Sequence, residues 1–123
     1  MHRLGYVAEE ELRVLYHRAA AVLYLSLYEG FGLPALEAMA AGAPTVVAAG
    51  SALPEVVGEA AMIAPPGNSF AITIALDRLR MEPELTEYMR VAGPARARLF
   101  PWEAAARKYL ALYGFSPGME LDR

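Results

Sequence analysis

Residues 22–48 read Val-Leu-Tyr-Leu-Ser-Leu-Tyr-Glu-Gly-Phe-Gly-Leu-Pro-Ala-Leu-Glu-Ala-Met-Ala-Ala-Gly-Ala-Pro-Thr-Val-Val-Ala, and this stretch decides the fold. It opens with the apolar run Val22–Leu25 and closes with the apolar run Thr45–Ala48, each as expected for a strand covered on both faces. Between them, Leu33–Ala41 has the pattern of a helix, with a proline in its first turn and Gly42 just past its end. A strand, a helix and a strand in this order predict parallel strands.

The same alternation continues on both sides of this stretch. Further strands are predicted at Gly5–Val7 and Ala61–Ala64, and further helices at Glu9–Ala20, Leu53–Val57, Ser69–Arg80, Pro83–Arg98 and Pro101–Tyr113. Asn68 or Ser69 is expected to cap the helix that follows it, and Gly93-Pro94 to kink or break the helix around it. Trp102 is expected to be a core anchor. The pattern favours an α/β fold with a parallel sheet of three to four strands and flanking helices.

Composition and charge limit the classes of function. The 123 residues suggest one domain, and a net charge of −3 argues against nucleic acid as a partner. The chain has no cysteine, and its two histidines cannot alone form a metal site. No apolar run reaches the roughly 18 residues that span a bilayer and no signal peptide is visible, so a cytoplasmic protein without a transmembrane segment is expected.

The middle of the chain has no basic side chain. From Ala19 to Asp77 there is no Lys, Arg or His. An anion bound in this region must therefore rely on backbone N–H groups or on cations from elsewhere. The start of the helix at Leu33 offers such N–H groups at the positive end of the helix dipole.

Two glutamates flank this predicted anion site. Glu29 lies in the loop before the helix, and Glu37 lies about one turn into it. Gly30 and Gly32 between them allow close approach of a ligand to the backbone. The layout suits a diphosphate flanked by the hydroxyls of a ribose and a hexose. On spacing alone, the more common alternative is that both glutamates are ordinary acids that favour the helix dipole.

The segment Glu29–Pro44 closely resembles the signature of family-four retaining glycosyltransferases, which have the two-domain GT-B architecture and carry two glutamates separated by seven residues. Three further segments resemble the same family. They are Leu4–Val7, Leu53–Gly58 and Phe100–Ala106. The resemblance implies that residues 1–113 are the C-terminal part of a Rossmann-like donor-binding domain, with a frayed tail at 114–123.

The resemblance also implies roles for individual residues. Glu29 is expected to be the catalytic contact to the donor sugar, and Glu37 to bind the ribose hydroxyls of the nucleotide. The backbone amides of Gly30, Phe31, Gly32 and Leu33 are expected to hold the diphosphate. The implied substrate is a nucleotide sugar such as a UDP- or GDP-hexose, bound without a metal or cofactor. Glu55 has a weaker claim and is interpreted as a helix-terminus acid.

The chain also departs from the family pattern. Leu25 stands where the family usually has proline, and Ala64–Gly67 lacks an acid that is common there. The acceptor domain, the first two strands of the donor domain and their basic residues have no counterpart. We therefore expect a donor-binding portion that is inactive alone, with a stand-alone binding module or an inactive remnant as alternatives. If the family's strand order is kept, Val22–Leu25 becomes an exposed edge that a second copy or a missing fragment covers.

Overall fold

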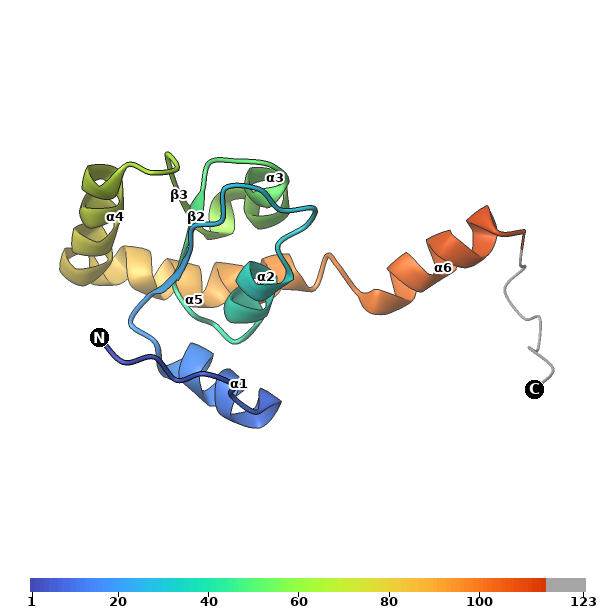
Figure 1. Cartoon of the computed structure of the whole chain (residues 1–123), viewed down its shortest axis with the longest axis horizontal. Helices are drawn as coiled ribbons and strands as arrows, with labels where there is room; N and C mark the ends of the chain where they lie inside the picture. The colour runs from blue at the N-terminus through green and yellow to red at the C-terminus, as the bar shows by residue number, and fades with distance from the viewer. Residues whose placement is uncertain (115–123) are drawn as a thin grey trace.

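The computed structural model, which describes residues 1–114, contains a parallel sheet packed among helices (Figure 1). In these residues it has three strands in the order β1-β2-β3. The strands are β1 (Val22–Tyr24), β2 (Thr45–Ala48) and β3 (Met62–Ala64). Val22 pairs with Thr45, and Val46 pairs with Met62. The α/β fold class with a small parallel sheet is therefore confirmed, and β1 is the edge strand that the sequence predicts.

Helices connect the strands and continue after the last one (Figure 1). They are α1 (Glu9–Arg18), α2 (Leu33–Ala40), α3 (Leu53–Val57), α4 (Ser69–Met81), α5 (Pro83–Ala97) and α6 (Trp102–Leu112), with a short 3-10 turn, η1 (Gly58–Ala60). The predicted cap of α4 is confirmed, because the Asn68 side chain accepts a hydrogen bond from the Ala71 N–H at 3.0 Å. The predicted helix boundaries are within two residues of those observed.

Strand β2 is covered on both faces, which explains its uninterrupted apolar sequence. Alternate residues of a strand point to opposite faces of the sheet. Val47 packs with residues of α2 and α3, including Met39 and Leu53. Val46 packs with residues of α4 and α5, including Leu79 and Met89. The two hydrophobic clusters thus lie on opposite faces of one strand.

Helix α5 continues through Gly93-Pro94, so of the predicted kink or break, the break is wrong. A Cβ on Gly93 would lie 2.9 Å from the Met39 carbonyl oxygen, so this glycine lets α5 approach the backbone of α2 closely. Arg90 of α5 also donates hydrogen bonds to two carbonyls, that of Gly42 just after α2 and that of Ala19 just after α1, at 3.2 and 3.3 Å. We attribute the tolerance of Pro94 to this packing, which offsets the lost helical hydrogen bond.

Two further expectations are wrong. Gly5–Val7 is not a strand, because no strand in residues 1–114 pairs with it, and Tyr6 is exposed. Trp102 is not a core anchor, since 72% of its surface is exposed. It opens α6, which extends away from the rest of the chain in Figure 1 and has no buried residue. The predicted frayed tail lies outside the described residues apart from Gly114.

Candidate functional site

The loop between β1 and α2 contains two glycines, and the fold requires only one of them to be glycine. Gly32 has a φ of 90°, in the left-handed region that favours glycine. A Cβ there would also lie 2.3 Å from Cδ2 of the buried Leu53. Gly30 does not have a positive φ, and beyond Gly30 itself and its two chain neighbours no heavy atom of the described residues lies within 4 Å of the place that a Cβ would take. The fold therefore requires glycine at 32, whereas space at 30 is left open.

The N-terminus of α2 presents unpaired donors. The Gly32 carbonyl accepts hydrogen bonds from the N–H groups of Ala35 and Leu36, at 3.1 and 3.3 Å. Within residues 1–114, the N–H groups of the segment 30–33 have no hydrogen-bond acceptor, and Pro34 has no N–H. These donors lie at the positive end of the helix dipole, where anions are stabilised.

Glu29 is held at both its side chain and its backbone. The Tyr24 hydroxyl donates a hydrogen bond to Glu29 Oε1 at 2.5 Å. This bond, followed by burial, raises the pKa of Tyr24 to about 12. The Glu29 N–H donates to Ser51 Oγ at 2.9 Å, and the Ser51 hydroxyl donates back to the Glu29 carbonyl. Ser51 itself has a φ of 56°, which is unusual for a residue with a side chain.

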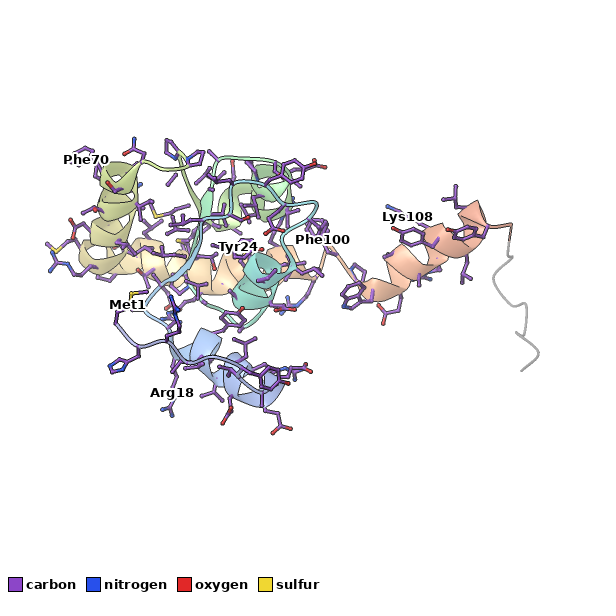
Figure 2. The ribbon with its side chains drawn as sticks, viewed as in Figure 1. Met1, Arg18, Tyr24, Phe70, Phe100 and Lys108 are labelled. Carbon is purple, nitrogen blue, oxygen red and sulfur yellow. The ribbon has the colours of Figure 1, made fainter. Side chains whose placement is uncertain are left out.

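The side chain of Phe31 contacts a residue that follows α5. Its ring meets that of Phe100 edge to face, with 5.4 Å between centroids. The Arg96 guanidinium lies 5.2 Å from the Phe100 ring centroid and donates hydrogen bonds to the carbonyls of Val56 and Glu55, at 2.9 and 2.5 Å. Figure 2 shows Phe100 between α5 and α6. The loop is thus connected to the end of α5 through aromatic contacts.

Glu37 is exposed on α2 and lines two cavities, each of about 820 Å³. One lies against α6 and is bordered by Phe31 and Trp102. The other lies against α1, where burial and then the charge of Glu37 raise the pKa of Tyr16. Glu29 lines neither of these cavities in the described part of the chain. The structure therefore brings both glutamates to one loop and helix but not into one cavity.

Sequence reasoning missed the partners of this loop. Tyr24 gave a usable signal, because its side chain places a hydroxyl group in an otherwise apolar strand. Ser51 and Arg96 gave no local signal, because their contacts span 22 and about 40 residues of chain. Arg90 and Arg96 do approach the cation-free middle of the chain, but both bind backbone carbonyls. Glu55 lies exposed in the first turn of α3, as expected of a helix-terminus acid.

This chain represents a class of α/β proteins. In this class a glycine loop and a helix N-terminus follow a strand of a parallel sheet, here an edge strand. Residues 1–96 match the family model described as "Glycosyl transferases group 1", and the chain belongs to this family. The resemblance to family-four glycosyltransferases with GT-B architecture is thereby confirmed.

Individual relatives agree with this assignment. The chain is 40% identical to O-antigen chain mannosyltransferase B of Escherichia coli, over 89% of this chain and 29% of that protein. It is 38% identical to MMP alpha-(1->4)-mannosyltransferase of Mycolicibacterium hassiacum, over 92% of this chain and 28% of the relative. Sucrose-phosphate synthase of Thermosynechococcus elongatus superposes with a TM-score of 0.81 at 34% identity, over 89% of this chain and 28% of that one. The chain therefore spans less than a third of the length of these relatives.

Two kinds of feature are absent from the described residues. In residues 1–114, no helix has both the length and the apolar character needed to cross a membrane. The same residues hold no group of three or more His, Asp and Glu side chains placed to bind a metal ion.

Proposed function

We propose that this chain is the donor-binding portion of a retaining glycosyltransferase that transfers a hexose from a nucleotide sugar to an acceptor. The observation that carries the proposal is the set of N–H groups without acceptors in segment 30–33, flanked by Glu29 and Glu37. Membership of the glycosyltransferase family supports the same interpretation.

Each part of the loop has a role in this proposal. The amides of Gly30, Phe31, Gly32 and Leu33 bind the diphosphate, with the dipole of α2 in place of a metal ion. Glu37 accepts hydrogen bonds from the ribose hydroxyls, and Glu29 contacts the hexose near its reacting carbon. Gly30 leaves open the space through which a phosphate reaches the backbone. Because two relatives are named mannosyltransferases, GDP-mannose is the first donor to test, with UDP-glucose second.

The chain by itself is proposed to bind the donor without turnover. Arg90 and Arg96 are the basic residues of α5, and both are bound to backbone carbonyls. Transfer needs charge stabilisation of the departing diphosphate and a positioned acceptor. We place these functions in the remainder of a longer, cytoplasmic enzyme, of the length that the relatives have.

Calorimetry with GDP, GDP-mannose, UDP and UDP-glucose tests this proposal. We expect one nucleotide and its sugar derivative to bind. Glu37→Ala should weaken the binding of both about tenfold, because it removes the hydrogen bonds that the charged carboxylate accepts. This factor corresponds to about 1.4 kcal/mol of binding free energy. The matched control is Glu87→Ala, which removes an exposed carboxylate from α5 and should leave affinity unchanged. An unaltered affinity in Glu37→Ala would show that the site assignment is wrong.

The edge of the sheet is proposed to be a contact surface. Leu23, in the middle of β1, has 43% of its surface exposed, and β1 pairs only with β2 among the described residues. Open edges pair with further strands, so we propose that a second copy or another part of the longer protein covers this one. Light scattering should show a concentration-dependent dimer that Leu23→Lys abolishes. A monomer at all concentrations would exclude the second copy.

A further inference from the structure

The contact between Tyr24 and Glu29 joins the hydrophobic core to the proposed donor site. Tyr24 lies on β1, where its backbone pairs with Val47, and its ring packs against the cluster that contains Met39 and Leu53. Figure 2 shows Tyr24 in the body of the protein, close to α2. The phenol oxygen is therefore held in place by the strand and by the core. It is a fixed donor for a glutamate that lies in a loop.

The bond takes one of the two carboxylate oxygens of Glu29. Its length of 2.5 Å lies in the range of charge-assisted bonds between a hydroxyl and a carboxylate. A carboxylate has acceptor positions on both oxygens, so Oε2 keeps its full capacity. Glu29 forms no ion pair among the residues that the structure describes, and a hydroxyl donor of a ligand would meet no competing cation there.

We propose that Tyr24 is a positioning residue for the donor sugar: its hydroxyl orients the Glu29 carboxylate so that Oε2 accepts a hydrogen bond from a hexose hydroxyl. This role rests on the proposed function, because it needs a hexose beside Glu29. It differs from a role in binding the nucleotide, which falls to Glu37 and to the amides of the loop.

The backbone of Glu29 is held independently of its side chain. Ser51 bonds both the N–H and the carbonyl of Glu29, so the loop keeps this anchor when the Tyr24 hydroxyl is removed. The aromatic ring of Tyr24 is retained in Tyr24→Phe, and with it the contact to the core. This substitution therefore releases the carboxylate while leaving the ring and the loop anchor in place.

The test compares affinity for a nucleotide sugar with affinity for its nucleotide. In calorimetry with GDP-mannose and GDP, and with UDP-glucose and UDP, we expect Tyr24→Phe to weaken the sugar nucleotide that binds by about tenfold and to leave its nucleotide unchanged. The matched control is Tyr28→Phe, which removes the same atom from a residue with 84% of its surface exposed and should alter neither affinity. Equal losses for both ligands would indicate a merely structural role, and no loss for either would overturn the proposal.

Titration of the Tyr24 phenol separates this proposal from the proposed function. The difference between wild type and Tyr24→Phe in tyrosinate absorbance isolates Tyr24, whose pKa is raised to about 12. In Glu29→Gln, which lacks the negative charge, we expect it to fall toward the ordinary value of about 10. A Tyr24 that ionises near 10 in wild type would overturn the positioning role alone. A wild-type chain that binds none of the four ligands would overturn the proposed function, and the positioning role with it.

Discussion

Helices α2 and α6 are both short, rich in apolar residues and part of segments that resemble the same family, yet they differ in burial. Ala35, Leu36, Ala38 and Met39 of α2 are buried. Helix α6 has no buried residue, although it carries Trp102, Tyr109 and Leu112. The difference lies in partners: α2 packs against both the sheet and α5, whereas the described residues offer no such cover for α6. Apolar composition therefore shows a tendency to be buried, and the packing partner decides the outcome.

The comparison matters for the candidate site because the loop is built on α2. Its residues are held by β1, by α3 and by the turn after α5, through Tyr24, Leu53 and Phe100. The cavity between α2 and α6 has one firmly packed wall and one wall without buried residues. We therefore infer that residues on the α2 side of the cavity fix the geometry of the candidate site.

The largest effect is expected for Met39→Ala in α2. Met39 is fully buried, so its truncation should lower the free energy of unfolding by about 2–5 kcal/mol through lost burial and a cavity. Urea denaturation followed by circular dichroism measures this. The matched control is Met81→Ala at the end of α4, where Met81 has 67% of its surface exposed and the change should stay within about 0.5 kcal/mol. Similar values for the two variants would contradict the packing described for α2.

A smaller effect is expected for Gly32→Ala at the start of α2. The positive φ and the close approach of Leu53 both oppose a Cβ, so unfolding should become easier by about 1–3 kcal/mol. Gly30→Ala is the comparison in the same loop, and its stability should stay close to that of wild type, because no described atom beyond the adjacent residues lies within 4 Å of the added methyl group. Its nucleotide affinity should nevertheless fall if phosphate reaches the backbone there. If Gly32→Ala unfolded like wild type, the left-handed turn would not exist in solution.

The smallest effect is expected for Trp102→Ala in α6. Because 72% of its surface is exposed, removal of this large side chain should change the free energy of unfolding by no more than about 0.5 kcal/mol. The same urea experiment measures it. A loss of about 2 kcal/mol or more, on the scale of buried aromatic residues, would mean that α6 packs against the body in solution.

Elements with a local signal were predicted well from the sequence. The apolar runs of β1 and β2 and the amphipathic pattern of α4 are set by neighbours in the chain, and so is the Asn68 cap. Errors occurred where the outcome depends on a distant segment. Gly93-Pro94 has the local pattern of a break, but contact with Met39 keeps α5 continuous. Trp102 is a large aromatic residue of the kind that often lies in a core, but the described residues do not bury it.

The candidate site divides in the same way. Glu29, Glu37 and segment 30–33 were identified from their spacing and their resemblance to a family signature, and their roles remain predictions. The hydrogen bonds of Glu29 to Tyr24 and Ser51 were not identified, nor was the contact of Phe31 with Phe100. Spacing along a chain defines which groups share a loop, but it carries no information on what packs against that loop from elsewhere.

By itself, the sequence determined the family, the parallel α/β class and the place of the glycine loop before α2, because these follow from periodicity, turn residues and a continuous motif. The edge position of β1 was implied by the strand order of the family that the sequence resembles. Only the tertiary structure decided that Gly32 and not Gly30 is required by the fold, that the Glu29 side chain is bound by Tyr24, and that α6 has no buried residue. The physical reason is that side-chain contacts and burial depend on groups brought together from distant parts of the chain. Residue patterns report local preference, and close packing selects among the arrangements that this preference allows.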